Sequence, residues 1–300
     1  MRTPLIASLA LWLALPAHAQ PAPADGGDAA PRLHANLSLS LLSDSRERGL
    51  SNSANRPSAK AALELLHASG LFAELELLRV SKAQYPGGSG LRTQLAGGYR
   101  WGDPDTWHYE LTLLHTRFPG SAQTGLADYR EVLDPVSGEV VDLEPVLTRV
   151  KPTTTELQAR LSYDQFSLRY YQTLSRDFYG INSETICAAL EDPLLSYECL
   201  QQGPQHSRGS VYLELAYRYR VGKAGSLEAR VGRQRVRHFR EFDTTSFSLE
   251  YRHLWRGFEF SAALVGARPR ERELYRVNVG DGRSRDSART TLVLGLARGF

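Results

Sequence analysis

Apolar and polar residues alternate with a period of two along most of this chain. In residues 33–41, every odd position is Leu or Ala and every even position is His, Asn or Ser. A period of two indicates a β-strand with one apolar and one polar face. Twelve segments with this pattern are predicted as strands: 33–41, 59–67, 71–81, 91–101, 107–117, 155–163, 166–175, 209–221, 226–238, 243–253, 258–268 and 289–300.

The connections between these segments differ in length according to the parity of the strand before them. Connections after even-numbered strands are short (68–70, 102–106, 164–165, 222–225 and 254–257). After odd-numbered strands five are long (44–58, 82–90, 118–154, 176–208 and 269–288), and one, 239–242, is brief. Membrane barrels have short periplasmic turns and long extracellular loops. The sequence therefore predicts an all-β fold, an antiparallel transmembrane β-barrel of about 12 strands with both termini in the periplasm.

Aromatic residues gather at the strand ends beside the short connections. Membrane barrels carry aromatic girdles of this kind at the lipid–water interface. The alternative is a set of core aromatics in a soluble β-protein. The residues are Trp101, Trp107, Tyr163, Phe166, Tyr217, Tyr219, Tyr251, Trp255, Phe258 and Phe300.

The N-terminus carries an export signal. Arg2 precedes an apolar run over residues 5–15, which ends at Pro16 and the triplet Ala17-His18-Ala19. This pattern is typical of a secretory signal peptide, so residues 1–19 are predicted to be removed. Residues 20–31 are rich in Pro, Ala, Gly and Asp and are predicted to be a flexible leader. Residues 32–300 then form the barrel, which we expect in a bacterial outer membrane after export through the periplasm.

Charge and hydropathy are compatible with a membrane barrel. The chain has 36 basic and 33 acidic residues, interspersed along its length, and this near balance does not indicate nucleic-acid binding. The mean hydropathy is −0.35, which does not exclude a barrel because its lipid face is hidden in the alternation.

The polar face of the predicted strands carries many charged residues. In lipid they would be very costly, whereas in a lumen they pair across strands or stay hydrated. Basic and acidic members nearly balance, so no strong ion preference is expected. Such charges serve either a salt-bridged core or a conducting path, and the long connections 118–154 or 176–208 are candidates to fold inward as a constriction. The predicted lumen residues are Lys60, Glu64, Glu74, Glu76, Arg92, Arg100, Glu110, Arg160, Arg169, Glu214, Arg218, Arg220, Glu228, Arg230, Glu250, Arg252 and Glu259.

The two cysteines, Cys187 and Cys199, share one segment without a strand pattern. An even pair in one loop of an exported protein predicts a disulfide. Neither cysteine has a nearby His or a CxxC spacing, so no metal site and no cofactor are expected.

Arginines cluster near the predicted outer ends of strands nine to eleven. Guanidinium donors match phosphate oxygens in bidentate fashion, so these residues are predicted to contact the phosphates of lipopolysaccharide. The alternative is a solvated charged rim. The residues are Arg233, Arg235, Arg237, Arg240, Arg268, Arg270 and Arg272.

Residues 42–76 resemble the opening of the TorF-type porin family. A Ser-Asp start, an Arg-Gly-x-Ser core, a Pro and a His-x-Ser-Gly turn followed by apolar and aromatic residues occur in the family's order. Ser45 and Glu47 stand where that family usually has aromatic residues. The resemblance implies a small outer-membrane porin. The matching positions are Ser43, Asp44, Arg46, Arg48, Gly49, Ser51, Ser53, Pro57, His67, Ser69, Gly70, Leu71 and Phe72.

The last twelve residues, RTTLVLGLARGF, look like the signal that the barrel assembly machinery reads, with Phe300 at the end. That machinery and outer-membrane lipids are the expected partners. A catalytic role is not indicated, because there is no GxSxG motif and the outward-facing His115 and His253 lie near opposite ends of their strands.

The sequence thus favours passive diffusion of small hydrophilic solutes through the lumen. Two other functions stay open. One is a closed structural or adhesive barrel whose outer loops bind a ligand, and the other is a membrane-embedded lipid hydrolase, by analogy of fold alone.

Overall fold

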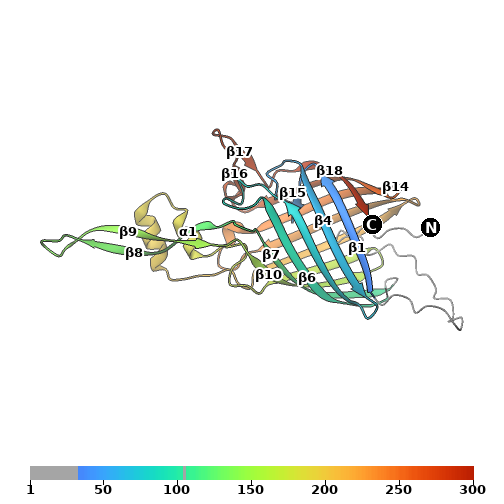
Figure 1. Ribbon diagram of the computed structural model, residues 1–300, viewed down its shortest axis with the longest axis horizontal. Helices are drawn as coiled ribbons and strands as arrows, with labels where there is room; N and C mark the ends of the chain where they lie inside the picture. Colours follow the sequence, from blue (N-terminus) through green and yellow to red (C-terminus); the bar gives the residue numbers. More distant parts are fainter. Residues whose placement is uncertain (1–32, 104–105) are drawn as a thin grey trace.

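The computed structural model describes residues 33–103 and 106–300. The predicted signal peptide and leader lie outside this range. Within it, twelve long strands form the barrel of Figure 1. They are β1 (Leu33–Leu42), β4 (Ser58–His67), β5 (Leu71–Arg79), β6 (Leu91–Gly102), β7 (Trp107–Arg117), β10 (Thr154–Tyr163), β11 (Phe166–Thr173), β12 (Val211–Val221), β13 (Gly225–Arg235), β14 (Thr244–Trp255), β15 (Phe258–Pro269) and β18 (Thr291–Gly299).

The barrel is closed and antiparallel. Going round it, the order is β1, β18, β15, β14, β13, β12, β11, β10, β7, β6, β5 and β4. The first and last strands close the ring, with Ser38 opposite Gly299. The predicted fold class is therefore confirmed, and each barrel strand lies within a few residues of the predicted segment.

The strands present apolar side chains to the outside. In β5, Leu71, Ala73, Leu75 and Leu77 are all exposed, while the residues between them are buried inside the barrel. The same alternation exposes leucines on strands around the ring. Exposed apolar surface of this extent is unfavourable in water and is the expected exterior of a barrel that spans a lipid bilayer.

The two ends of the barrel differ, as the connection lengths predict. We call the end with the long connections the loop end and the other the turn end. At the turn end, aromatic side chains of neighbouring strands contact one another, with 4.5 Å between the rings of Trp107 and Tyr163 and 4.9 Å between those of Phe166 and Tyr217. These rings are exposed on the outside, where an interfacial girdle lies.

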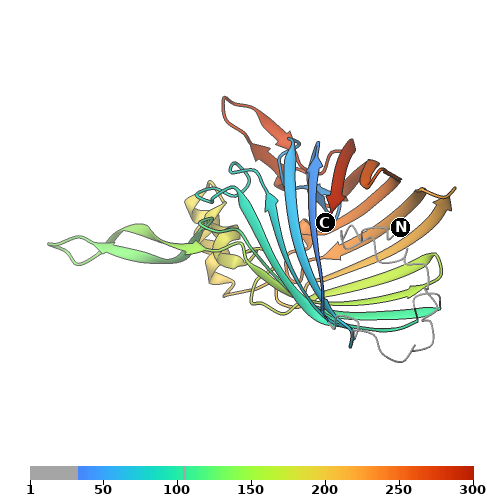
Figure 2. The same cartoon turned by 45° about the vertical axis from the view of Figure 1, so that its right-hand side comes forward.

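The connection 118–154 does not fold into the barrel. It contains a hairpin of β8 (Gln123–Leu133) and β9 (Val140–Val150), which extends away from the loop end (Figures 1 and 2). The prediction that this connection narrows the lumen is wrong. The backbone N–H and C=O groups of β8 and β9 are paired with each other in an antiparallel ladder, and most of the side chains of the hairpin are exposed.

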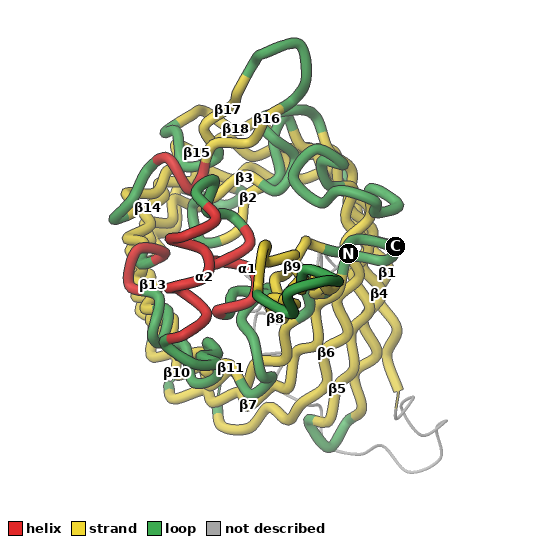
Figure 3. The backbone as a smooth tube through the Cα atoms, turned by 90° about the vertical axis from the view of Figure 1, so that its left-hand side faces the viewer, coloured by secondary structure: helices red, strands yellow, loops and turns green. Residues whose placement is uncertain are grey.

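The connection 176–208 contains two short helices, α1 (Ser183–Ala188) and α2 (Pro193–Gln201). Asn182 caps α1 through its side chain, and Asp192 caps α2 just before Pro193. A disulfide joins Cys187 in α1 to Cys199 in α2, with 5.6 Å between the Cα atoms. The helices lie beside the mouth at the loop end (Figure 3). No helix in the described part of the chain is long and apolar enough to cross a membrane.

The first connection, between β1 and β4, enters the barrel, and Tyr179 at the start of the connection 176–208 contacts it there. It contains the short strands β2 (Arg46–Glu47) and β3 (Leu50–Ser51), which Figure 3 shows within the ring of barrel strands. We call residues 43–57 the inner loop. The last long connection carries a small hairpin of β16 (Arg276–Asn278) and β17 (Ser284–Asp286), which contacts the inner loop through bonds from Asn55 to Asp286 and from Arg285 to Ala54.

Candidate functional site

The lumen is lined by charged side chains that alternate with the outward leucines. With one exception, each predicted lumen residue is buried or half-buried inside the barrel. The exception is Arg220, which is exposed at the turn end and does not line the enclosed lumen. It shares the inward face of β12 with Arg218, but it lies one residue from the strand's end, where the barrel opens to solvent.

One ion-pair network lies on the wall formed by β4 to β7. The Arg100 guanidinium bonds Glu64 at 2.9 Å and Glu110 at 2.8 Å, and it stacks 3.7 Å from the centre of the Phe72 ring. Buried charges are tolerated only when they are paired and hydrogen-bonded, as here. Near the turn end, the lumen beside this wall is therefore filled by side chains.

A second network lies on the wall formed by β12 to β14. Glu228 pairs with both Arg218 and Arg230, and Glu250 pairs with Arg252 and, at 3.9 Å, with Arg230. The nearby Arg169 bonds Glu214 at 2.9 Å across β11 and β12. Alternating charges across neighbouring strands hold these long side chains against the wall.

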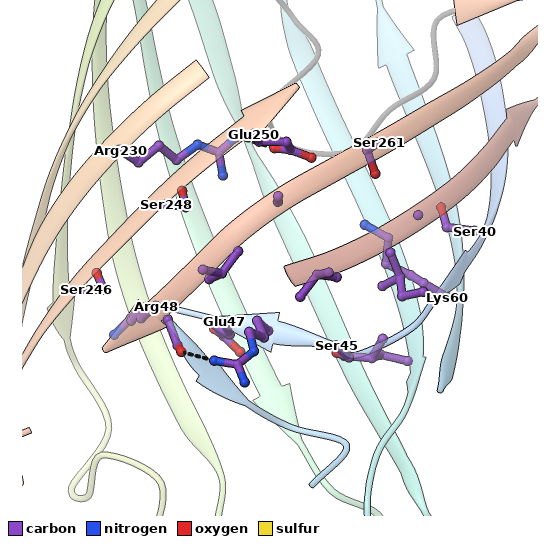
Figure 4. A pocket seen from close by; sticks show the side chains of 18 of the residues that line it. Ser40, Ser45, Glu47, Arg48, Lys60, Arg230, Ser246, Ser248, Glu250 and Ser261 are labelled. Atoms are coloured by element: carbon purple, nitrogen blue, oxygen red, sulfur yellow. Dashed lines mark hydrogen bonds and ion pairs between the residues drawn. The ribbon is translucent and has the colours of Figure 1, made fainter. Parts of the chain in front are cut away.

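The wall formed by β14, β15, β18 and β1 is different because its inward side chains are mostly small. Those that border the cavity include Ser246, Ser248, Ser261, Gly295 and Ser40. Small residues leave space, and a cavity of about 350 Å³ runs inside the barrel along this wall (Figure 4). Lys60, Glu76 and Arg92, on the neighbouring strands β4, β5 and β6, also line it.

Asp44 organises the inner loop at the edge of this cavity. Its carboxylate accepts hydrogen bonds from Ser51 and Ser53, at 2.6 and 2.8 Å, and from Arg46 at 2.6 Å. Arg46 also donates to the carbonyl of Gly49 and to the side chain of Asn55. Short polar residues thus close the loop on itself, which leaves the next two side chains free to reach the barrel wall.

These two side chains, Glu47 and Arg48, attach to different parts of the wall. Glu47 pairs with Arg92 on β6 and accepts a bond from the Tyr179 hydroxyl at 3.3 Å. Burial raises the pKa of Tyr179 well above its ordinary value, with a further contribution from Glu47, so this phenol stays a donor.

Arg48 reaches other strands of the wall. It pairs with Glu156 on β10 at 2.7 Å and bonds Gln234 on β13 at 2.6 Å. Its guanidinium lies 4.8 and 4.7 Å from the ring centres of Tyr171 and Tyr212. The inner loop therefore bridges the lumen from β6 to β10 and β13 and narrows it near the loop end.

Gly49 lets the loop pack closely against the barrel. It has a φ of +81°, and a Cβ added there would lie 2.3 Å from the carbonyl oxygen of Gly266 on β15. Only glycine meets both conditions without strain.

The residues of the TorF-type motif do not form one site. Ser43, Asp44, Arg46, Arg48, Gly49, Ser51 and Ser53 build the inner loop, and Pro57 precedes β4. His67, Ser69 and Gly70 form the turn after β4 at the other end of the barrel, where the His67 ring bonds the Ser69 hydroxyl at 2.8 Å. Gly70 has a φ of +94° beside the carbonyl of Arg100.

Several lumen residues were not predicted. Glu156 and Gln158 share the inward face of β10 with the predicted Arg160, so the alternation contained the signal that identifies them. Tyr171 and Tyr212 likewise share faces with Arg169 and Glu214. Glu47 lies outside the predicted strands, so the alternation contains no signal that identifies it.

His115 and His253 are both exposed on the outside. His115 bonds Thr155 near the loop end of β7, and His253 lies beside Tyr251 near the turn end of β14. The structure does not bring these two side chains together.

The sequence matches a model of a known protein family. A family model described as "Bacterial protein of unknown function (Gcw_chp)" covers residues 24–300. The chain belongs to this family. None of the curated proteins matches the sequence. The described inner loop and lumen are thus those of a Gcw_chp protein.

Several solved structures resemble this Gcw_chp barrel. The KdgM porin shares 9% identity, covers 88% of this chain and 99% of its own, and has a TM-score of 0.43. The NanC porin shares 10%, covers 88% and 98%, and has a TM-score of 0.49. The CymD monoaromatic hydrocarbon channel shares 10%, covers 89% and 87%, and has a TM-score of 0.39.

Proposed function

We propose that this protein is an outer-membrane porin of the TorF type, through which small hydrophilic solutes diffuse passively. The observation that supports this most is an unfilled polar cavity inside a barrel with an apolar exterior. A cavity of about 350 Å³ is large enough to hold several waters.

The cavity walls fit polar solutes. Serine hydroxyls and paired charges along the cavity replace the hydrogen bonds that a sugar or amino acid makes with water. Positive and negative groups lie within the same narrow section, with Glu47 and Glu76 beside Arg92 and Lys60. The inner loop then sets the size limit.

Liposome swelling with solutes of graded size tests this proposal. We expect rapid swelling with glycine, and a swelling rate that decreases steeply from amino acids to disaccharides. Empty liposomes and liposomes with heat-denatured protein are the controls. An absence of swelling with the smallest solute would contradict the proposal.

A closed barrel with ligand-binding outer loops is the second candidate. It is favoured by the attachment of the inner loop across the lumen, to Arg92 on β6 and to Gln234 on β13, and by the exposed β8–β9 hairpin. In that case no solute would enter the liposomes. Phospholipid hydrolysis in the same liposomes would instead indicate a lipid hydrolase.

The assembly machinery is a proposed partner through Phe300. Its backbone N–H donates to the carbonyl of Leu37 at 2.8 Å, and its ring is exposed outside the barrel. Deletion of Phe300 is expected to reduce the folded protein in the outer membrane, and normal insertion would contradict this role.

Lipopolysaccharide is a proposed partner of the arginine cluster. Arg233, Thr245 and Arg268 form one outward row across β13, β14 and β15. Arg235 and Arg270 are also exposed, whereas Arg272 pairs with Asp286 and is less available. We expect Arg233→Gln with Arg268→Gln to reduce the lipopolysaccharide retained on purification, and unchanged retention would count against it.

A further inference from the structure

A second cavity lies at the loop end, outside the lumen. It has a volume of about 530 Å³ and lies between the end of the inner loop, the connection from β5 to β6, and Val279 beside β16. Three cationic residues, Arg56, Arg79 and Lys82, line it, and no Asp or Glu does. We call it the cationic pocket.

The three cations lack acidic partners. No ion pair within 4.0 Å joins Arg56, Arg79 or Lys82 to a carboxylate in the described part of the chain. By contrast, most lumen cations are paired. Three like charges around one cavity repel each other, so an anion there would lower the electrostatic free energy.

The walls of the cationic pocket are fixed by backbone bonds. Val80 donates to Gly90 at 2.8 Å and Ser81 donates to Asn52 at 2.9 Å, which ties the connection from β5 to β6 to the inner loop. The Ser58 hydroxyl donates to the carbonyl of Arg79 at 2.6 Å. The pocket is therefore held in shape before any ligand enters.

The cationic pocket lies where the apolar exterior ends. Arg79 is the last residue of the outward row that contains Leu75 and Leu77, and it pairs in register with the exposed Leu91 of β6. In a bilayer, this boundary is where lipid headgroups meet the protein. A headgroup is thus the anion source that this position favours.

We propose that the cationic pocket binds a phosphate group carried by a lipid headgroup of the surrounding leaflet. Guanidinium groups of Arg56 and Arg79 bind phosphate oxygens in bidentate fashion, and Lys82 contributes a third charge. Hydroxyls of Ser81 and Ser89 also line the pocket and supply neutral donors. The proposal rests on the proposed location in an outer membrane, but it does not require an open pore.

The test is lipid binding by the purified, detergent-folded protein. The probes are diphosphorylated lipid A, the same lipid after removal of its phosphates, and inorganic phosphate. Both variants carry Arg233→Gln with Arg268→Gln, which removes the other phosphate contacts proposed above. In that background, Arg79→Gln with Lys82→Gln is the test variant, and Arg220→Gln with Arg256→Gln at the turn end is a control with the same loss of charge. If the double variant does not fold, Lys82→Gln alone is used. Lys82 is exposed and lies outside the barrel strands, so its substitution should not disturb folding.

We expect the test variant to bind diphosphorylated lipid A about tenfold more weakly, since each lost charge-assisted bond has a substantial effect. The control variant and its parent with the Arg233→Gln and Arg268→Gln substitutions should bind equally. Unchanged binding by the test variant would overturn the site. If the phosphate-free lipid binds as tightly as diphosphorylated lipid A, the phosphate is not what the pocket recognises. If inorganic phosphate binds as tightly as the lipid, the ligand is free phosphate and not a lipid headgroup. The conductance of the wild type is measured separately. If the protein binds the lipid but does not conduct, the porin proposal fails and the lipid-binding proposal stands.

Discussion

Arg48 and Glu156 form an ion pair of 2.7 Å although 108 residues separate them in sequence. Arg48 lies on the inner loop and Glu156 on β10. The pair therefore fixes the loop to a strand that is distant from it in sequence. The pair is largely buried, and a buried pair contributes mainly when both partners are present. It is therefore the contact that best explains why the inner loop stays in the lumen.

Arg48→Ala is expected to release one side of the inner loop. Glu156 would be left buried without its cation, which costs about 3–5 kcal/mol in comparable cases. The loop should then spend time out of the lumen, and single-channel conductance should rise. The combined variant Arg48→Met, Glu156→Gln removes both charges and should lose less stability. If Arg48→Ala leaves both conductance and stability unchanged, the pair does not hold the loop.

Gly49→Ala is expected to displace the same loop for a different reason. The added Cβ would overlap the carbonyl of Gly266, and the positive φ alone costs about 1–2 kcal/mol. Gly222→Ala is a matched control, because Gly222 also has a positive φ but nothing lies within 4 Å of its Cβ position. Channel recordings should show a larger conductance for the Gly49 variant only. Equal behaviour of the two variants would mean that the contact with Gly266 is unimportant.

Arg100→Met is expected to destabilise the barrel rather than to open it. The substitution leaves Glu64 and Glu110 buried without their common cation, at a cost of about 3–5 kcal/mol. Urea unfolding followed by tryptophan fluorescence measures the loss. Arg220→Met at the exposed turn end serves as the comparison and should change stability by less than about 0.5 kcal/mol. A similar small effect at Arg100 would contradict the structural role of its network.

Reduction of the disulfide should affect only the helical connection. The bond between Cys187 and Cys199 closes a short loop, and such a loop contributes roughly 3 kcal/mol to the segment it constrains. We expect faster proteolysis within residues 176–208 after reduction, with an unchanged heat-dependent gel mobility of the barrel. Loss of the folded gel mobility on reduction would show that the helices are needed for barrel closure.

The barrel was predictable because its physical signal repeats. Each strand must show apolar residues to lipid and polar residues to the lumen, so every strand from β1 to β18 that joins the ring carries the same alternation. The β8–β9 hairpin is not predicted because most of its residues are exposed on both faces, and α1 and α2 are not predicted because they are too short to show a helical period.

The lumen was predictable in composition but not in shape. Alternation placed Glu64, Arg100 and Glu228 inside, and it failed at Arg220 because a strand's face does not show where the barrel opens to solvent. The inner loop was not identified as the constriction. Its position depends on contacts such as Arg48 with Glu156, between residues that are far apart in sequence and carry no local pattern.

Single-channel recording of the wild type beside a variant with a shortened inner loop tests the central claim most directly. In the variant, residues 46–55 are replaced by a short glycine-serine link, which leaves the barrel strands intact. We predict discrete conductance steps for the wild type and clearly larger steps for the variant, since the inner loop narrows the lumen that solutes cross. If both proteins are folded in the bilayer and neither conducts, the barrel is closed by its own lining and the proposed pore does not exist.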